Sequence, residues 1–445
     1  MDVMKKRWIL VLGAMILVLL LMLGYLTKPE KVKESVESKY PSHGVPIMEI
    51  NLNGITQEEI NAGSKKIKYP GNNVNIYDNG KLSEYNDVEV KGRGNATWTW
   101  DKRPYQIKFS EKTDILGMGK GKKWCLLANY RDETNLRTLT GFTLEKMLGM
   151  DYTMDGRFVE LYFDDNYQGL YYLTKAVEVS SNVVDLEDPL GVLVELDNLY
   201  GKREDTYYIT GNKDILTIKD MVEEENEEEA MEDFLKDYNK LEKAIKEKDY
   251  DLIQELIDVE SFAQYYLLSE FTVNPDAYWT SFYMHKDGEE DKIHAGPGWD
   301  FDMAFANRYW NNWLGDKLYS PTETMIRKTE LSPKTWVEMG YKESEFVEDK
   351  RLSKIMFNLV EIPEFQTEIE RVFRKQMMGR GQDLIDGIVG QATIIYRAAL
   401  LDTEKWEKDD FVINTETLIQ WIKARYNYFE EVYGNYGIDR KQVLL

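Results

Sequence analysis

The chain has 445 residues, of which 43% are hydrophobic and 13% aromatic, and its formal net charge is −23. This length suffices for two or three domains, or for one two-lobed domain with additions. The negative charge argues against a nucleic-acid partner, because phosphates attract basic surfaces, and it equally disfavours docking on an anionic membrane surface. Cys125 is the single cysteine and the chain has three histidines, which excludes an intrachain disulfide and a His-rich metal site.

The N-terminus predicts a membrane anchor. Within residues 1–26, the basic residues Lys5, Lys6 and Arg7 precede an uncharged stretch of about nineteen residues, 8–26, which is long enough to span a bilayer. No small-residue cleavage site follows, so we expect an uncleaved signal anchor. Because basic residues stay on the cytoplasmic side, we expect a single-pass protein with an extracytoplasmic body. Residues 27–44 are polar and predict a linker.

Short alternating segments dominate from residue 45 to about residue 220. They include IMEINL, VNIYD, DVEVKG, YQIKF, RFVELYF, GLYYLTKAVEV, VLVELD and ILTIKD. Alternation of apolar and polar residues between Gly, Asn and Asp is typical of strands. FDDNYQG is expected to join two strands as a hairpin. NLRTLTGFTLEKMLG, at residues 135–149, interrupts them with apolar residues at helical spacing.

The second half of the chain is predicted to be helical. The acidic EEENEEEAMED, at 223–233, favours a solvated helix face or an insertion, and SFAQYYLLSEF, at 261–271, favours a buried helix. A strand-rich first half before a helical second half predicts a two-lobed α+β protein. The expected divisions are a β-rich N-lobe at 45–178, a helical C-lobe at 179–435 with an acidic insertion at 220–250, and a tail at 436–445.

One lysine is a candidate phosphate ligand. In the predicted strand RPYQIKF, Tyr105, Ile107 and Phe109 point to one side, and Gln106 and Lys108 point to the other. If the apolar side packs into the protein, Lys108 faces outward and can bind phosphate as a point charge. An ordinary solvent-facing lysine is the alternative.

A glycine-containing turn precedes this strand. KGRGNATWTW contains Arg93, Gly94 and Asn95, and backbone N–H groups in such a turn can bind anions. The turn matches neither GxGxxG nor GxxxxGK[ST]. A plain hairpin turn is the alternative.

Three carboxylates lie close to aromatic residues further along the chain. Asp276 follows a proline, and Asp300 and Asp302 belong to the segment GPGWDFD. Because a predicted hairpin separates them, Asp276 and Asp300 can reach the same end of a sheet. Mg²⁺ suits one or two carboxylates plus substrate phosphates, and a separate Asp can accept the proton of an attacking hydroxyl. Turn-capping aspartates are the alternative.

Five segments in order carry a resemblance. RGNATW…KRPYQIKF, LGMGKGKKWCLLANYRDETNLR, RFVELYFDDNYQGLYYLTKAVE, GVLVELD and GPGWDFDMAF together resemble the spore coat protein H (CotH) kinase family over roughly residues 45–435. The resemblance implies a diverged protein-kinase-like fold that binds ATP with Mg²⁺ or Mn²⁺. It also implies transfer of phosphate to serine or threonine of a protein, with a coat or surface protein as the expected substrate.

The resemblance also implies roles for particular residues. Lys108 takes the place of the nucleotide-anchoring lysine and Asp276 that of the catalytic aspartate. Asp300 is the metal-binding aspartate, with Asp302 as its neighbour. The turn at residues 93–95 covers the phosphates, and YYLTKAVE is the linker between lobes.

The sequence departs from the family at one position. Family members commonly have an Asn, a second metal ligand, where this chain has Ser281, and a hydroxyl is a weaker ligand than an amide carbonyl. Glu145 is a candidate partner for Lys108.

Two alternatives to a kinase remain open. Ser281 and the outward topology favour a non-catalytic surface or coat assembly protein that retains the fold as a binding module. The third hypothesis is a carbohydrate-active surface enzyme with Asp276 and Asp300 as its carboxylate pair.

Overall fold

The computed structural model describes residues 38–274, 276–307 and 353–434. The predicted anchor at residues 1–26, most of the linker and the tail at 436–445 lie outside these ranges. The chain forms two compact units, each assembled from separate stretches of sequence. Of the described residues, unit 1 comprises those within 38–136, 155–176 and 382–420, and unit 2 comprises those within 137–154, 177–381 and 421–434.

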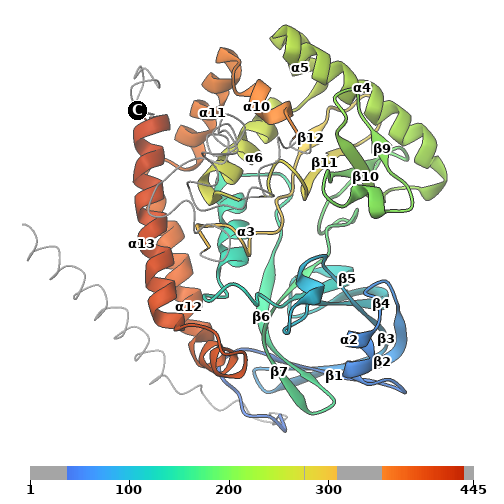
Figure 1. The fold of residues 1–445 in the computed structure, drawn as a ribbon, viewed down its shortest axis with the longest axis vertical. Coiled ribbons are helices and arrows are strands. Elements are labelled where there is room, and N and C mark those ends of the chain that lie inside the picture. The colour runs from blue at the N-terminus through green and yellow to red at the C-terminus, as the bar shows by residue number, and fades with distance from the viewer. Residues whose placement is uncertain (1–37, 275, 308–352, 435–445) are drawn as a thin grey trace, which may run out of the picture. The chain divides into compact units, whose positions relative to one another are not determined.

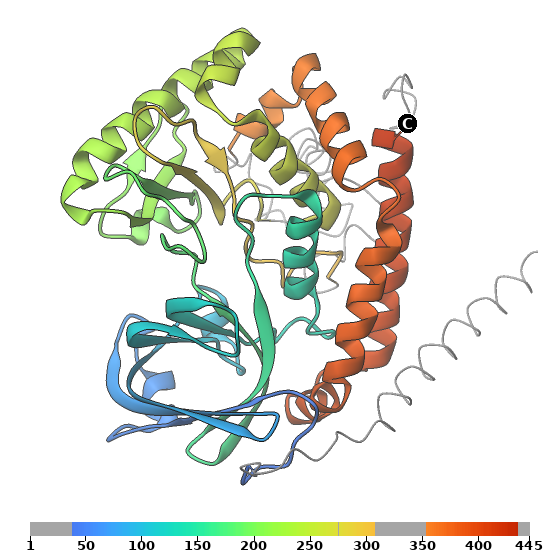
Figure 2. The same cartoon turned by 180° about the vertical axis from the view of Figure 1, so that it is seen from behind.

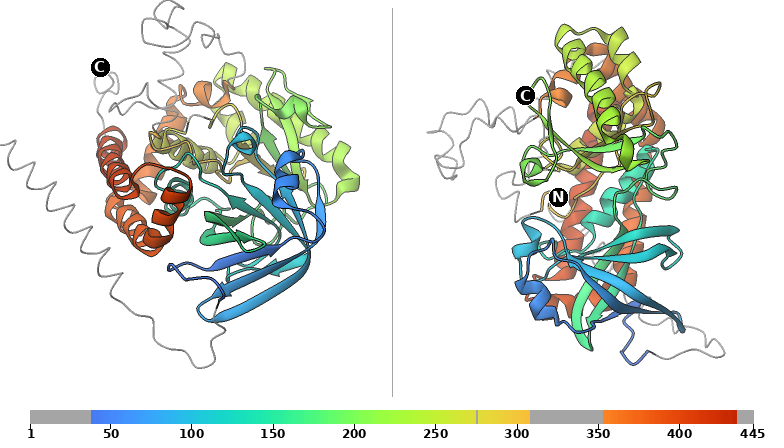
Figure 3. Two further views of the ribbon diagram at one scale, coloured as in Figure 1. Left: turned by 60° about the horizontal axis from the view of Figure 1, so that its bottom comes forward. Right: turned by 90° about the vertical axis from the view of Figure 1, so that its right-hand side faces the viewer.

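Unit 1 contains a closed seven-stranded barrel (Figures 1 and 3). The strands follow one another around the barrel in the order β1 (Ile47–Asn51), β2 (Tyr69–Asp78), β3 (Lys81–Gly92), β4 (Tyr105–Asp114), β5 (Lys120–Leu127), β7 (Asn166–Lys175) and β6 (Gly156–Phe163). β1 pairs antiparallel with β2 and parallel with β6, which closes the barrel. A short helix, α2 (Gln57–Ala62), and a 3₁₀ turn, η1 (Thr97–Thr99), lie in the connections.

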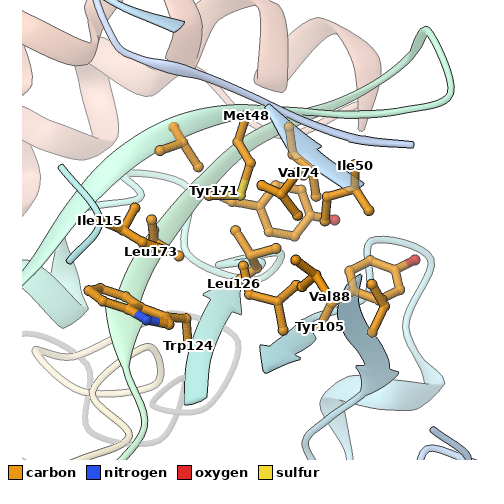
Figure 4. Packing of buried hydrophobic residues seen from close by; sticks show 14 of the residues in the cluster. Met48, Ile50, Val74, Val88, Tyr105, Ile115, Trp124, Leu126, Tyr171 and Leu173 are labelled. Atoms are coloured by element: carbon orange, nitrogen blue, oxygen red, sulfur yellow. The ribbon is translucent and has the colours of Figure 1, made fainter. Parts of the chain in front are cut away.

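Alternate residues of these strands fill the barrel interior (Figure 4). Tyr105, Ile107 and Phe109 of β4 are buried there, whereas Gln106 and Lys108 are only partly covered. The predicted two sides of this strand are therefore confirmed. Burying an apolar side chain of this size contributes about 1.5–3 kcal/mol, so the interior set fixes which face of each strand turns outward.

The hairpin predicted at FDDNYQG is also confirmed. β6 pairs antiparallel with β7, and Phe163 lies opposite Asn166. The two residues of the turn, Asp164 and Asp165, have φ angles of 43° and 70°. Two-residue hairpin turns favour positive φ at both central positions, and Asp tolerates it better than most side chains.

A buried cluster of charges lies within unit 1. The Lys102 ammonium contacts Oδ1 of Asp402 at 2.6 Å and donates to the Leu170 carbonyl of β7 at 2.6 Å. Lys408 contacts the other oxygen of Asp402 at 3.3 Å. Burial lowers the pKa of Lys102 to about 8. Burial also opposes ionisation of Asp402, but the two ammonium groups outweigh it and lower its pKa.

Asp402 belongs to α12 (Gly381–Lys405), which is long and apolar enough to cross a membrane by length and composition alone. Within unit 1 the carbonyl of its Ile394 lies beside Gly44, and its Asp402 accepts a hydrogen bond from the Leu170 N–H. These contacts give α12 a packing role against the barrel.

Unit 2 contains a five-stranded sheet with helices around it. The sheet order is β12 (His294–Ala295), β11 (Phe282–Lys286), β8 (Val192–Leu196), β10 (Ile215–Met221) and β9 (Tyr208–Ile209). The helices of this unit are α3 (Arg137–Leu148), α4 (Glu227–Glu247), α5 (Tyr250–Leu256), α6 (Val259–Thr272), α10 (Ile355–Leu359) and α11 (Pro363–Gln376). α13 (Phe411–Phe429) begins in unit 1 and ends in unit 2.

The predicted acidic stretch forms the start of α4, which lies over the sheet (Figures 1 and 2). Its inner side is fixed by polar contacts: Glu242 accepts from Thr210, and Lys286 of β11 contacts Asp233 and Asp237. α6 is buried at every residue from 261 to 272, as predicted. The structure is thus a mixed α+β protein with a β-rich first part and a helical later part.

The buried cluster in unit 1 predicts a large stability effect. Asp402→Asn keeps the shape of the side chain but leaves the Lys102 ammonium buried without a counter-charge. We expect the free energy of unfolding to fall by about 3–5 kcal/mol, measured by urea denaturation of the chain. As a control, Glu361→Ala removes an exposed pair with Lys248 and should cost under about 1 kcal/mol. Equal losses in both variants would contradict this account.

Candidate functional site

The outer face of the barrel presents a group of lysines in unit 1. Lys108 of β4 lies opposite Glu89 of β3 and Lys123 of β5, and Lys91 of β3 lies opposite Gln106. Because side chains alternate along a strand, all five point away from the apolar interior. In the described part of the chain, the side chains of Lys91 and Lys108 form no hydrogen bond or ion pair.

Lys91 carries the clearest electrostatic signal on this face. Burial lowers its pKa most and the charge of Lys68 lowers it further, Glu89 and Cys125 oppose this shift, and Arg93 adds a smaller lowering effect. A partly buried ammonium group among other cations is stabilised by any anion that approaches it. The face therefore suits a ligand with several negative charges, such as a polyphosphate.

The turn at residues 93–95 adjoins this face. The Arg93 N–H donates to the Pro104 carbonyl at 3.2 Å, and Gly94 has φ +81°. A Cβ at Gly94 would collide with Oγ1 of Thr97, so only glycine fits. The side chain of Asn95 is exposed and accepts a hydrogen bond from Lys65.

In unit 2 one asparagine links the two segments that carry the candidate carboxylates. Oδ1 of Asn274 accepts the Asp276 N–H at 3.1 Å, and its amide nitrogen donates to the Asp300 carbonyl at 3.3 Å. The hairpin of β11 and β12 lies between these segments in sequence. Asn274 thus links the backbone at Asp276 to the backbone at Asp300, and the meeting of their carboxylates at one end of the sheet stays a prediction.

Aromatic residues anchor the segment around Asp300. Trp299 and Phe301 are buried and pack against Phe142 of α3 at centroid distances of 5.8 and 6.0 Å. A Cβ at Gly141 would collide with the Phe301 ring, so the close packing requires glycine there. Asp300 stands between the two anchors, is exposed and has φ +65°. The rings hold the backbone, and the carboxylate between them stays in solvent.

Ser281 ends the turn that begins at Asp276. The Asp276 carbonyl accepts the N–H groups of Trp279 and Thr280 at 3.0 and 3.1 Å. The Ser281 N–H donates to Oε1 of Glu195 at 3.0 Å, whereas its hydroxyl makes no hydrogen bond within the described residues. The hydroxyl is therefore available to a ligand.

Glu145 of α3 is completely buried in unit 2. Its Oε2 accepts the Met154 N–H at 3.2 Å, and its Oε1 has no hydrogen-bond partner among the described residues. Burial raises its pKa well above the usual range. The side chain lies beside Gly298, and its expected pairing with Lys108 stays a prediction.

Metal binding by protein groups alone is not supported within residues 38–274, 276–307 and 353–434. No group of three or more His, Cys, Asp or Glu side chains is arranged there to hold a metal ion. Mg²⁺ needs only one or two carboxylates when phosphates supply further oxygen ligands. The exposed Asp300, the partly exposed Asp302 and the Ser281 hydroxyl are oxygen donors of the kind that it prefers.

The structure has Lys108 on a strand and Asp276 at a turn, as predicted, whereas the roles of the candidate residues stay predictions. Unit 1 holds Arg93, Gly94, Asn95 and Lys108, and unit 2 holds Asp276, Ser281, Asp300 and Asp302. The neighbouring residues that the sequence did not indicate are Lys91, Asn274 and Glu195. Only the orientation of Lys91 could have been predicted, because apolar and polar residues alternate in DVEVKG and place this lysine on the opposite face of the strand from Val90.

The fold and these groups together define a class: a mixed α+β protein with lysines suited to phosphate and with two linked aspartates. Comparison with known families matches residues 90–429 to the family described as CotH kinase protein. The chain belongs to the CotH kinase family, and membership implies kinase activity and the use of ATP. No curated protein matches the chain.

The lysine face predicts the effect of two substitutions on nucleotide binding. Lys108→Ala and Lys91→Ala should each weaken ATP binding about tenfold or more, since a hydrogen bond to a charged group contributes about 1.5–3 kcal/mol. Calorimetric titration measures this, and the melting temperature should stay near wild type because both side chains point outward.

Lys112 of the same strand is exposed and provides the matched control. Lys112→Ala should bind ATP as the wild type does. If all three variants bind equally well, the lysine face is an ordinary solvated surface.

Proposed function

We propose that the chain is a protein kinase of the diverged two-lobed type that transfers the γ-phosphate of ATP to serine or threonine of coat or surface proteins. The observation that carries the proposal is the link made by Asn274, which ties the backbone at Asp276 to the backbone at Asp300. Two aspartates of different exposure, whose backbones are joined by one side chain, suit separate roles in proton acceptance and metal binding.

In this proposal Lys91 and Lys108 bind the phosphates of the nucleotide. Both are without an ion-pair partner in the described chain and lie on one outward face of the barrel. Arg93, Gly94 and Asn95 contribute the adjacent turn, where glycine allows the backbone to approach an anion closely.

Asp300 and Asp302 would hold Mg²⁺, or Mn²⁺, with Ser281 as a further oxygen donor. When bound, the ion neutralises charge on the phosphate oxygens. Asp300 is suited to this role because its carboxylate is exposed while its neighbours Trp299 and Phe301 fix its backbone.

Asp276 would orient the attacking hydroxyl and accept its proton. The hydroxyl oxygen forms a bond to the γ-phosphorus, the bond from that phosphorus to the bridging oxygen breaks, and ADP leaves. The proton passes to the Asp276 carboxylate. The turn that starts at this residue, closed by its carbonyl, fixes the backbone from which the carboxylate extends.

A binding module is the second candidate function. The observation that favours it is Ser281, whose backbone is committed to Glu195 and whose side chain is a weaker metal ligand than an amide carbonyl. In that case the protein would assemble coat or surface components without transferring phosphate.

The two aspartates should respond differently to neutralisation. Asp276→Asn should leave ATP binding near normal while phosphate transfer falls by about 10²–10⁴-fold, the usual scale for loss of a general base. Asp300→Asn should reduce both metal-dependent ATP binding and transfer. Transfer from labelled ATP to casein-like or self substrates, with parallel binding titrations, separates the two roles.

The variant Ser281→Asn tests for a gain of function. It should raise transfer or metal affinity, because an amide carbonyl replaces a hydroxyl at a ligand position. Wild-type protein that transfers no phosphate, with normal nucleotide binding in both aspartate variants, would favour the binding module.

We further propose that residues 8–26 anchor the protein in a membrane with its body outside the cytoplasm. The support is the uncharged stretch behind three basic residues. Protease added to intact cells should remove the body of the chain. Full protection, with cleavage only after the membrane is opened, would place the body in the cytoplasm.

A further inference from the structure

Two carboxylates of unit 2 hold the end of the turn that carries Asp276. Oε1 of Glu195 accepts the Ser281 N–H at 3.0 Å, and Oδ1 of Asp197 accepts the Thr280 hydroxyl at 2.8 Å. The two residues are two positions apart, at and just beyond the end of β8, so both side chains lie on one face of the sheet. Their two hydrogen bonds stabilise the end of the turn.

The turn needs such support because its backbone is unfavourable. Ser281 has φ +56°, a left-handed conformation that disfavours residues with a Cβ. A non-glycine residue stays in this region only when its surroundings determine it. The hydrogen bond from the Ser281 N–H to Glu195 stabilises this backbone conformation.

Glu195 in turn depends on a cation. The residue is 4% exposed. Burial raises its pKa, the neighbouring charge of Asp197 raises it further, and the ammonium of Lys219 opposes both. Lys219, on β10, is exposed as a residue, and its ammonium forms an ion pair with Glu195. The protein atoms around the ammonium lower its pKa, but the Glu195 carboxylate outweighs them, so the pKa is raised.

Without the Lys219 ammonium, the buried Glu195 carboxylate loses the partner that fixes its position and draws in water. The charge-assisted bond to the Ser281 N–H then weakens. Lys219 therefore influences the turn without contacting it, through a chain of three groups: ammonium, carboxylate and backbone N–H.

We propose that Lys219 is a positioning residue for phosphate transfer, which holds Glu195 through their ion pair and thereby fixes the turn from Asp276 to Ser281. The positioning role rests on the proposed function of Asp276. The hold on the turn rests only on the contacts described above.

The experiment uses the full chain with three variants: Lys219→Met, Lys219→Arg, and the double variant Lys219→Met with Glu195→Gln. Lys219→Met should lower kcat about tenfold or more with little change in KM for ATP. It should also speed amide hydrogen exchange in the peptide that spans residues 276–282. Lys219→Arg keeps the charge and should retain most of the transfer activity.

The double variant separates indirect from direct action. The glutamine introduced by Glu195→Gln is neutral, needs no cation, and still offers an amide oxygen to the Ser281 N–H, so transfer and slow exchange should recover. Lys243 is exposed on α4, and Lys243→Met should change neither measurement. This control accounts for any effect of losing a positive charge from a protein that is already strongly acidic.

Three outcomes would overturn the proposal. Normal kcat and normal exchange in Lys219→Met would show that the lysine does not hold the turn. A double variant as poor as Lys219→Met would show that the ammonium acts on the phosphate directly rather than through Glu195. If the wild type transfers no phosphate, the kinase proposal fails, and unchanged exchange in Lys219→Met would overturn the hold on the turn as well.

Discussion

The structure of unit 1 depends on one constraint: in a closed barrel, every strand residue lies either inside or outside. β1 pairs with both β2 and β6, so no strand edge is left open in the ring. The interior accepts apolar side chains such as Ile107 and Trp124, and the lysines that alternate with them must face outward. A lysine-bearing outer surface follows from the same alternation that builds the core.

Much of this could be predicted from the sequence because alternation is a local signal. The two sides of the Lys108 strand, the hairpin at Asp164 and the buried helix at 261–271 depend on residues close together in the chain. Closure of the barrel could not be predicted, since it requires Ile47 to pair with Glu160, more than a hundred residues away. The two lobes, their boundaries and the membrane anchor remain predictions.

For the candidate site, too, some features could be predicted from the sequence and others could not. Asp276 and Asp300 were found because their neighbours in sequence are distinctive, whereas their link through Asn274 is made in three dimensions. The pairing of Lys219 with Glu195 could not be predicted from the sequence because of an irregularity in β10. The register of β10 shifts between Ile218 and Asp220, so a simple period of two does not indicate which face Lys219 occupies.

The buried partnership of Lys102 and Asp402 has a consequence for how the chain is made. The two residues are 300 positions apart, and a ribosome adding about 5–20 residues per second needs roughly 15–60 s to cover that distance. All seven barrel strands emerge before the counter-ion of Lys102 exists. The nascent barrel must therefore leave this lysine hydrated, and the site that α12 later covers stays open to chaperones until synthesis is nearly complete.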